Sequence, residues 1–577
     1  MFKRKEIIDF DKVFNDENYN DYIEKLETLP KELLFKASTF LLSFHHSDSF
    51  VHSHYELLSK WFGEANNKIA NEINDKINEY IKTIGHEIVI INPRSSLELF
   101  ERILSIKDTP ITVTESGFEL LLFKVYLALN QKLNENDKLI SETAKSNKNY
   151  PVLINLAIGM SLPTFDISNY NIAPIFITQV LRAIYLFEFL EERIELKPFL
   201  QEFYNRFNVG GYKEYLGKIL PISGSIISSK EQGNINLVIN KDEKLDANID
   251  FLNKLSVTHI SDEEEFQDDF LYLRANPLLR TDEYTFQIIF PLFAIEKNFN
   301  GLYFLLKEIN DNLPKEKQIK LRQLITYDFS EKYVLYKLLE NIYKKKYFKL
   351  KGVDINTSGA PDYYIRNGNK VFIFESKDIL INAKIKTSYD FNEYEKALKE
   401  KLYFYNNGKK EKPKAVKQLL NFTEKLLTNS FKEDKRFKPN SIKIYPIIVL
   451  HNRQLDIIGL NNLINIWFAK ELEKLKEKSL LIKNVRNITI INIDTLIIFQ
   501  EQLKSGKIKL EMILDEYQKW IKKSELENKK FKNQEEHFST IENSLVSFNM
   551  YIFNKYSWEP PKEFADKAYS LIEKPSA

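Results

Sequence analysis

The hydrophobic pattern of this chain changes near residue 328, and that change constrains the possible folds most. Over residues 10–207, apolar side chains recur every three or four positions, as amphipathic helices require. Beyond residue 328, helical patterns alternate with short strand-like runs, which predicts an α/β core. A chain of 577 residues is also too long to fold around one ordinary hydrophobic core. We therefore predict a mixed fold, with a mostly α-helical N-terminal region followed by a C-terminal α/β domain.

Proline, glycine and charged residues interrupt the apolar pattern and divide the chain into four expected regions. They are a helical domain over 1–208, a connector and second helical block over 209–327, the α/β domain over 328–520, and a helical extension over 521–577. The connector includes short strands near 236–240, and its helical block opens at residue 276. Asp328 or Ser330 is expected to cap the first helix of the α/β domain.

Within the α/β domain, the pattern predicts a regular alternation of elements. In chain order we expect a helix over 329–347, a strand hairpin, helices over 394–403 and 415–427, a strand over 442–450, a helix over 460–476, a strand over 488–493 and a helix from 494.

The predicted hairpin combines a tight turn with a buried strand. Residues 363–365 and 370–376 are strand-like, and Asn367-Gly368 between them suits a turn with positive φ. The run Val-Phe-Ile-Phe at 371–374 is apolar on both faces, which is typical of a strand inside a sheet. We expect this strand to lie in the interior of the domain.

Charged residues stand at the open end of this hairpin. Asp362 precedes the first arm, while Glu375 and Lys377 end the second, where strand alternation places them on one face. Phosphodiester hydrolysis uses divalent cations, and hard cations such as Mg²⁺ prefer carboxylate and carbonyl oxygens. The simpler interpretation is that Glu375 and Lys377 only mark where the strand meets solvent. The combination of hairpin, buried strand and three charges favours a catalytic centre.

Pro361-Asp362 and Glu375-Ser376-Lys377, with the hairpin between them, resemble the PD-(D/E)XK or restriction-endonuclease-like nuclease superfamily. The resemblance implies a small mixed sheet flanked by helices and a metal-dependent phosphodiesterase. It implies that Asp362 and Glu375 ligate Mg²⁺, with Mn²⁺ as an alternative, and that the Ser376 carbonyl is a further ligand. Lys377 would orient or activate the attacking water.

The resemblance covers residues 329–499 and suggests two further site residues. Members often carry another carboxylate on the first helix, and Glu331 matches that position better than Glu340; Glu331 could equally be a first-turn residue favoured by the helix dipole. Some members carry glutamine and tyrosine four residues apart on a later helix. Gln418 is similar, but Phe422 replaces the tyrosine that is typical of the exonuclease branch. Gln418 therefore remains a candidate catalytic residue, and an endonuclease is favoured.

Basic residues concentrate directly after the motif. Residues 381–440 hold 15 Lys and Arg against 8 Asp and Glu, whereas the whole chain has a net charge of only +2. A loop-to-helix cluster in this stretch is suited to the phosphates of nucleic acid, although most charge runs are only solvated surface. Its members are Lys409, Lys410, Lys412, Lys414 and Lys417.

Several other kinds of site are disfavoured. The chain has no cysteine, which excludes disulfides, thiolate zinc sites and cysteine nucleophiles. His45, His46, His52 and His54 lie close together, but without an accompanying Glu-x-x-His pattern a loop is favoured over a metal site. His451, at the end of a core strand, is expected to be structural. No Gly-x-x-x-x-Gly-Lys loop occurs, so an intrinsic ATP motor is not supported.

Two alternative functions follow from the sequence. The first is a metal-dependent DNA nuclease, with RNA as a less favoured substrate, regulated by its helical region. Restriction-like nucleases joined to large helical regions often serve bacterial defence against phages or mobile elements, which is what the resemblance implies. The second is a non-catalytic nucleic-acid-binding or scaffold protein with a nuclease-like domain. We expect a cytoplasmic location without a membrane, because no signal segment is visible, and a homo-oligomer or defence-system partner.

Overall fold

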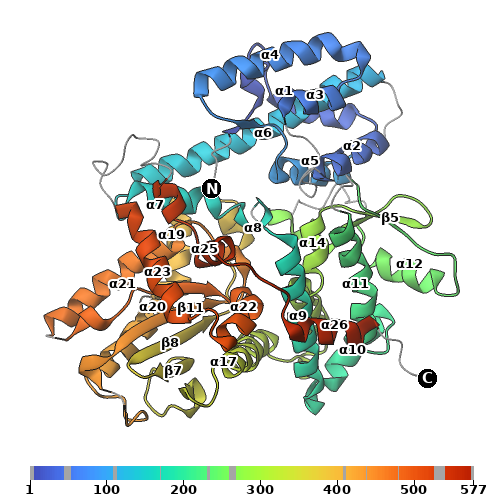
Figure 1. Cartoon of the computed structure of the whole chain (residues 1–577). Coiled ribbons are helices and arrows are strands. Elements are labelled where there is room, and N and C mark those ends of the chain that lie inside the picture. The colour runs from blue at the N-terminus through green and yellow to red at the C-terminus, as the bar shows by residue number, and fades with distance from the viewer. Residues whose placement is uncertain are drawn as a thin grey trace.

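The computed structural model describes most of the chain in eleven stretches. These are residues 6–43, 53–107, 113–168, 170–229, 234–258, 268–406, 408, 411–436, 438–478, 480–525 and 540–572. The described residues are mostly helical, and a five-stranded mixed sheet lies among the C-terminal helices (Figure 1). This is the mixed class that the sequence predicts, with helices first and the sheet second.

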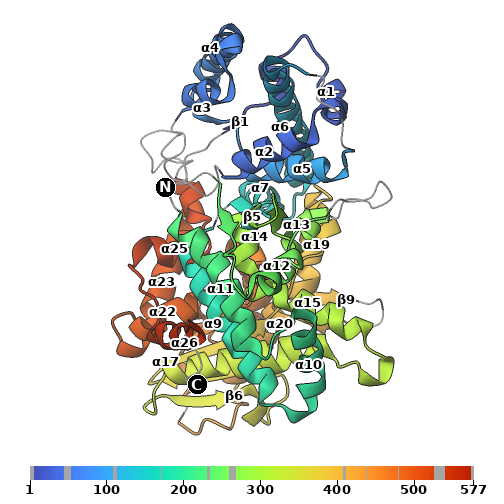
Figure 2. The ribbon, with the colours of Figure 1, turned by 90° about the vertical axis from the view of Figure 1, so that its right-hand side faces the viewer.

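The first part of the chain forms a helical layer at one end of the molecule, which both views show (Figures 1 and 2). Its elements are β1 (Glu6–Ile7), η1 (Phe10–Lys12), α1 (Asn20–Lys25), η2 (Leu26–Thr28), α2 (Lys31–Ser43), α3 (His54–Trp61), η3 (Glu64–Asn66), α4 (Asn67–Ile84), β2 (Ile88–Val89), α5 (Pro93–Ser105) and α6 (Glu115–Ser146). Thr114 caps the long helix α6 by accepting a hydrogen bond from Gly117 N at 3.2 Å. α6 leads from this layer to the rest of the molecule.

The middle part packs its helices around α9. Its elements are α7 (Val152–Ser161), α8 (Phe165–Ser168), α9 (Ile172–Glu191), η4 (Ile194–Leu196), α10 (Lys197–Phe207), α11 (Tyr212–Ser228), β3 (Asn236–Val238), α12 (Leu245–Asn253), η5 (Asp268–Phe270), α13 (Leu271–Ala275), β4 (Leu278–Arg280), β5 (Thr285–Ile288), α14 (Pro291–Glu296), α15 (Asn300–Asn312) and η6 (Lys315–Lys317). β3 agrees with the strand predicted near 236–240. The helical block predicted from residue 276 is wrong at its start, because 278–288 forms a hairpin whose second strand pairs with both β3 and β4.

Helix α9 is apolar on nearly all sides, as a central core helix must be. By length and composition alone it could cross a membrane, but 72% of its most apolar window is buried inside the protein. This helix lies inside the helical domain predicted over residues 1–208, and Gln179 and Arg182 interrupt its apolar sequence. Both polar side chains are buried and hydrogen-bonded.

The C-terminal sheet has the strand order β12-β11-β8-β7-β6. Its strands are β6 (Phe348–Lys351), β7 (Tyr363–Asn367), β8 (Lys370–Lys377), β11 (Lys443–Leu450) and β12 (Thr489–Asn492). β6, β7 and β8 are antiparallel neighbours, whereas β8, β11 and β12 run parallel. The hairpin and both later strands are confirmed. The edge strand β6 was not predicted, because no Gly or Pro separates its alternating Phe-Lys-Leu-Lys pattern from the preceding helix.

Helices cover both faces of this sheet. In chain order the remaining elements are α16 (Leu321–Gln323), η7 (Leu324–Leu335), α17 (Tyr336–Ile342), η8 (Gly352–Asp354), α18 (Ala383–Lys386), α19 (Phe391–Leu398), η9 (Lys399–Tyr403), β9 (Phe404–Asn406), β10 (Glu411–Pro413), α20 (Ala415–Leu427), η10 (Pro439–Ser441), η11 (Arg453–Leu455), α21 (Leu460–Glu477), η12 (Ile482–Asn484), α22 (Ile493–Ser505), α23 (Leu510–Ile521), η13 (Lys522–Glu525), α25 (Phe548–Lys555) and α26 (Lys562–Ile572). The helices predicted over 394–403, 415–427, 460–476 and from 494 are confirmed.

The first helix of the α/β region begins earlier than predicted. α16, η7 and α17 form one continuous helix from Leu321 to Ile342, and η7 is π-helical. Asp328 and Ser330 therefore lie inside the helix, and their predicted capping role is wrong. Ser330 is fully buried and donates a hydrogen bond to Asp378 Oδ2 at 2.6 Å. This contact ties the middle of the helix to the segment that follows β8.

The two faces of the sheet belong to different hydrophobic clusters. Phe372 and Phe374 face a cluster that includes α9, α17 and α22. Val371 and Ile373 face a second cluster that includes α7, α19, α20 and α21. Helices from the middle of the chain thus cover the C-terminal sheet, and the open end of the hairpin lies between the two layers.

Candidate active site

The hairpin brings the two acidic motifs together as its sequence predicts. Tyr363 pairs with Phe374, so the next position in the antiparallel register sets Asp362 opposite Glu375. Ser376 N donates a hydrogen bond to Asp362 Oδ2 at 2.6 Å, which fixes the Asp362 carboxylate against the end of β8. The tight turn at the other end of the hairpin uses a glycine with a φ of 60°.

Glu375 and Lys377 lie on the same face of β8 and contact each other. Lys377 Nζ lies 2.6 Å from Glu375 Oε1. Glu375 is only 1% exposed, and its second oxygen, Oε2, is buried without a hydrogen-bond partner among the residues that the structure describes. A buried carboxylate oxygen without a donor is costly, so this atom indicates a place where a ligand could bind.

Glu331, on the π-helical turn of η7, belongs to the same electrostatic group. Burial, followed by the negative charges of Asp362 and Glu375, raises the pKa of Glu331 to about 8. Burial and then the charge of Asp362 also raise the pKa of Glu375 to about 8. Burial raises the pKa of Asp362. These three carboxyl groups therefore lie close enough to repel one another.

Lys377 offsets part of this repulsion. Burial alone would lower the pKa of its ammonium, but the charges of Glu375 and Asp362 outweigh burial and raise that pKa. The group therefore carries a positive charge at neutral pH. Glu340, the alternative to Glu331, instead forms an ion pair with Lys349 and accepts a hydrogen bond from Tyr363 Oη at 2.6 Å.

The donor set fits a hard cation held by few protein ligands. No group of three or more Asp, Glu or His side chains within the described ranges is arranged to hold a metal ion by itself. Asp362, Glu375 and the Ser376 carbonyl offer a smaller oxygen set, and Mg²⁺ is commonly held by one or two carboxylates and several waters. A cation here would give Glu375 Oε2 a partner and relieve the repulsion among the carboxylates. Glu331 is coupled electrostatically to Asp362 and Glu375 but does not form a three-carboxylate metal group with them in the described structure.

His451 supports the end of β8 from the neighbouring strand. Its Nε2 lies 2.8 Å from Ser376 Oγ, and burial lowers the pKa of the imidazole to about 3, which keeps it neutral. Arg182 of α9 donates a hydrogen bond to the His451 carbonyl at 2.8 Å. His451 therefore supports the structure, as expected, and does so through a direct contact with Ser376 of the candidate centre.

The predicted basic cluster is only partly directed at this site. Burial and then the charge of Lys377 lower the pKa of Lys414, so Lys414 lies near the centre. Gln418 follows one turn later on α20, is partly exposed and donates its main-chain N–H to Lys414 O at 2.8 Å. Lys417 is engaged elsewhere, in an ion pair with Glu411.

Of the other lysines in this cluster, one lies on the surface and two lie outside the described residues. Lys412 is exposed on β10, which pairs with β9 in a hairpin that the sequence did not reveal. Lys409 and Lys410 lie outside the described residues, as do His45, His46 and His52. His54 contacts Asn78 Oδ1 through Nε2 at 3.1 Å.

Sequence reasoning missed Tyr336 as a residue of this site. Its hydroxyl is buried without a hydrogen-bond partner in the described part of the chain. Burial, followed by the charges of Glu331 and Asp362, raises its pKa, so the phenol stays neutral beside the carboxylates. Tyr336 lies on the apolar face of the helix, so its sequence position predicted only packing and gave no indication of a role in the site.

Comparison with known proteins adds no relative. No protein-family model matches the chain, and no curated protein matches it significantly. The function has to be inferred from the geometry of the site.

Proposed function

We propose that this chain is a metal-dependent nuclease of the PD-(D/E)XK kind that hydrolyses phosphodiester bonds in DNA. The juxtaposition of Asp362, Glu375 and Lys377 at the end of a buried strand carries this proposal. Lys377 lies 2.6 Å from Glu375, and Asp362 is held 2.6 Å from the Ser376 amide. Ionisable groups kept together in an interior cost stability, and such clusters occur preferentially at functional sites.

The arrangement of the sheet supports the same family. An antiparallel hairpin, β7–β8, continues into a parallel pair, β8–β11, and helices cover both faces. This is the small mixed sheet flanked by helices that the sequence resemblance implies. The acidic residues stand where β8 leaves the core, which is the expected position for carboxylates that meet a phosphate.

Each residue of the site has a role in this proposal. Asp362, Glu375 and the Ser376 carbonyl would hold Mg²⁺, which when bound neutralises the scissile phosphate and lowers the pKa of water. The protonated Lys377 donates to the attacking water or to a phosphate oxygen. Lys414 adds positive charge on the nucleic-acid side. Gln418, one turn further along α20, is proposed to hydrogen-bond phosphate or water.

The function test combines cleavage with metal binding. Purified chain is incubated with plasmid, single-stranded DNA and RNA in Mg²⁺ or Mn²⁺, and Mn²⁺ binding is measured by calorimetry. Glu375→Gln and Lys377→Ala should lower the cleavage rate by ~100-fold or more, the scale of lost acid–base and electrostatic assistance. Glu424→Gln, which removes a surface carboxylate paired with Lys478, is the matched control and should cut normally.

The outcomes separate the nuclease from the scaffold alternative. Cleavage that survives both site substitutions in a folded protein would show that another site or a contaminant cuts. Mn²⁺ binding that is unchanged in Glu375→Gln, together with DNA binding but no cleavage, would support the non-catalytic alternative. As part of the same proposal, the helical region ahead of the site regulates cutting in a bacterial defence role, with a second copy or a partner protein as the trigger.

A further inference from the structure

A cavity lies beside the candidate centre at the same edge of the sheet. It encloses about 260 Å³. Lys377 of β8 is in register with Leu450 of β11, and Leu450 with Asn492 of β12. Because neighbouring strands are ~4.8 Å apart, Asn492 lies roughly 10 Å from Lys377 along this edge. Ligands of open α/β sheets bind outside the carboxyl ends of parallel strands, and this cavity occupies that place.

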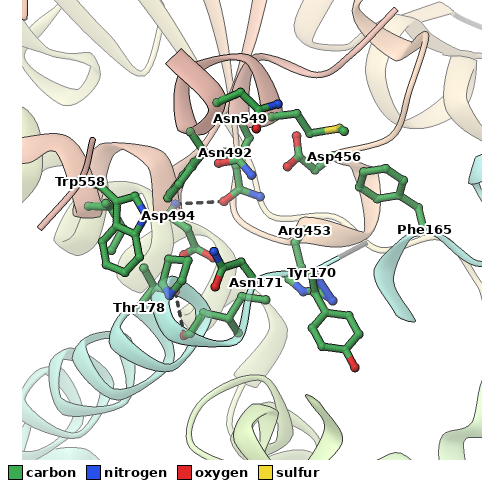
Figure 3. A pocket seen from close by; sticks show the side chains of 16 residues that line it. Phe165, Tyr170, Asn171, Thr178, Arg453, Asp456, Asn492, Asp494, Asn549 and Trp558 are labelled. Carbon is green, nitrogen blue, oxygen red and sulfur yellow. Dashed lines mark hydrogen bonds between the residues drawn. The ribbon is translucent and has the colours of Figure 1, made fainter. Parts of the chain in front are cut away.

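Segments far apart in the chain contribute its polar lining. Arg453 and Asp456 follow β11, whereas Asn492 ends β12 and Asp494 follows it. Helices α9 and α25 close the other sides, and α25 contributes Asn549. Figure 3 shows these side chains gathered around one space.

Aromatic side chains bound the polar groups. In Figure 3, Trp558 lies on one side of the cavity and Phe165 on the opposite side, with Asp456 and Asn492 between them. Tyr170 lies below Arg453 in the same view. Aromatic faces at the margins and hydrogen-bonding groups in the middle suit a planar ligand with a polar edge.

The middle of the cavity is rich in acceptors. Asn492 Oδ1 already accepts a hydrogen bond from Asp494 N at 2.9 Å, and the Asn492 side chain lines the cavity with its amide as a possible donor. Asp456 places a carboxyl group in the lining, and burial raises its pKa to about 7. A matching ligand therefore presents several N–H donors to the carboxylates and one acceptor to the Asn492 amide.

The charges of the lining disfavour a phosphate. Arg453 Nε lies 3.5 Å from Glu296, and its guanidinium donates to the Asp166 carbonyl. Asp456, whose pKa burial raises to about 7, adds partial negative charge to the same lining, and Asp494 is paired with Arg182. The cavity volume is also below the ~300 Å³ at which pockets for drug-sized ligands begin. The ligand should be small, planar and free of negative charge.

We propose that this cavity binds a nucleobase-type heterocycle with at least two N–H donors on one edge, as guanine has. The base enters as a free nucleoside or as a base turned out of the substrate strand. Asp456 and Asp494 accept its N–H groups, Asn492 donates to its carbonyl, and its ring contacts Trp558. Binding itself does not depend on the proposed nuclease activity.

The cavity is connected to the candidate centre by a short chain of contacts. Asp494 forms an ion pair with Arg182 at 3.3 Å. Arg182 donates to the His451 carbonyl at 2.8 Å, and His451 Nε2 lies 2.8 Å from Ser376 Oγ. A base that contacts Asp494 would therefore bias the position of the Ser376 segment. This connection between the cavity and the Ser376 segment rests on the proposed nuclease function only if it is measured through DNA cleavage.

Binding is tested in the full chain carrying Glu375→Gln, so that cleavage cannot interfere. Guanosine, adenosine, cytidine and uridine are titrated while tryptophan fluorescence is followed, and Trp558→Phe identifies the contribution of Trp558. A duplex with one mismatched guanine tests the substrate as the source of the base. We expect saturable quenching with guanosine or with the duplex. Asp456→Asn should weaken binding by ~10-fold or more, and Asp137→Asn, a carboxylate of α6 outside the cavity, should not.

The outcomes decide the proposal directly. Saturation by guanosine alone assigns a free nucleoside as the ligand, and saturation by the mismatched duplex alone assigns a substrate base. If neither probe gives a saturable signal at millimolar concentration, or if Asp456→Asn and Trp558→Ala both bind as well as the parent, the site does not exist. The connection is tested by hydrogen exchange: ligand should protect residues 374–378, and Arg182→Lys should abolish that protection while binding persists. Protection that persists in Arg182→Lys overturns the connection.

Discussion

At the scale of single residues, the site is governed by carboxyl groups that share a small buried volume. Burial raises the pKa of Glu331, Asp362 and Glu375, the charge of Asp362 adds to the rise at the other two carboxyl groups, and Lys377 offsets only part of the negative charge. Like charges held together in an interior need a cation or protons to balance them. The same arrangement that costs stability is the one on which the proposed metal site rests.

Glu331 and Glu340 differ in environment although both lie on the first helix of the α/β region. Glu331→Gln should lower the cleavage rate by ~10-fold or more, because it removes a carboxylate that is coupled to Asp362 and Glu375. Glu340→Gln should leave the rate unchanged, because the Glu340 carboxylate is engaged by Lys349 and Tyr363. Steady-state cleavage with Mg²⁺ measures both. Equal losses in the two variants would remove Glu331 from the site.

Glu101 on α5 should make the stability of the protein depend on pH. It is 6% exposed, and burial followed by the charge of Glu98 raises its pKa from 4.5 to about 8. The folded state holds this proton more tightly than the unfolded chain does. The stabilisation is therefore complete below about pH 4.5 and is lost as the pH rises through about 8.

Glu101→Gln should remove this loss. The variant should have a larger free energy of unfolding than the wild type at pH 8 and a similar one at pH 4.5. Urea denaturation at the two pH values provides the measurement. Glu98→Gln removes the neighbouring charge that adds to the raised pKa of Glu101, so it should reduce the pH dependence only in part, because burial remains the larger cause. Parallel pH profiles for Glu101→Gln and the wild type would contradict the assignment.

At the scale of elements, the position of Asp362 depends on close backbone packing between the end of β6 and the start of β7. Gly352 N donates to Asp362 O at 2.8 Å. A Cβ on Gly352 would lie 2.7 Å from Pro361 O and 3.0 Å from Asp362 O, closer than side-chain carbons approach backbone oxygens. Glycine is required here because the backbones approach each other, whereas Gly368 is required for its φ of 60°.

Gly352→Ala and Gly368→Ala should therefore have different effects. Gly352→Ala should displace Asp362 and reduce cleavage and Mn²⁺ binding by ~10-fold or more, because site geometry tolerates little displacement. Gly368→Ala should lower the free energy of unfolding by ~1 kcal/mol with near-normal cleavage, since nothing lies within 4 Å of its added Cβ. Cleavage rates and urea denaturation are compared for both. Normal activity in Gly352→Ala would mean that this contact does not position Asp362.

At the scale of the whole molecule, buried ion pairs connect helices from three parts of the chain. Lys386 of α18 is 1% exposed and lies 2.7 Å from Asp269 and 3.2 Å from Asp166. Arg274 lies 2.8 Å from Asp166. Burial opposes ionisation of Asp166, but the charges of Lys386 and Arg274 outweigh burial and lower its pKa. The network therefore joins α8, η5 and α18 into one unit.

Removing Lys386 should separate these parts. Lys386→Met should lower the free energy of unfolding by about 3 kcal/mol, because Asp166 and Asp269 then stay buried with Arg274 as the remaining cation that pairs with both. Lys384 on the same helix is exposed, so Lys384→Met should change the free energy of unfolding little. Urea denaturation measures both variants. A loss below about 1 kcal/mol in Lys386→Met would show that solvent replaces the ion pair.

Local patterns were sufficient for much of the α/β region. The hairpin of β7 and β8 followed from Asn367-Gly368 and the apolar run 371–374, because turn geometry and strand alternation act over a few residues. The helix over 415–427 and the strand over 442–450 followed in the same way. For that reason the closeness of Asp362, Glu375 and Lys377 could be predicted.

Contacts between distant segments could not be predicted in this way. The Asn276-Pro277 punctuation suggested a helix, but pairing with β3 makes 278–288 a hairpin. Ser330 looked like a helix cap, yet its contact with Asp378 places it inside a longer helix. Lys414 and Lys417 have the same sequence character, and only packing directs one toward the centre and the other toward Glu411.

The sequence by itself determined the mixed class, the hairpin and the motif at its open end, because these depend on residue patterns a few positions long. Only the tertiary structure decided that Glu331 joins the motif, that His451 and Arg182 support it, and that a cavity between α9, α25 and two strands lies beside it. Those relations join residues up to about 300 positions apart through buried polar contacts, as Arg182 and Asp494 do. Burial and distance set their charges and partners, and neither is written in the local pattern.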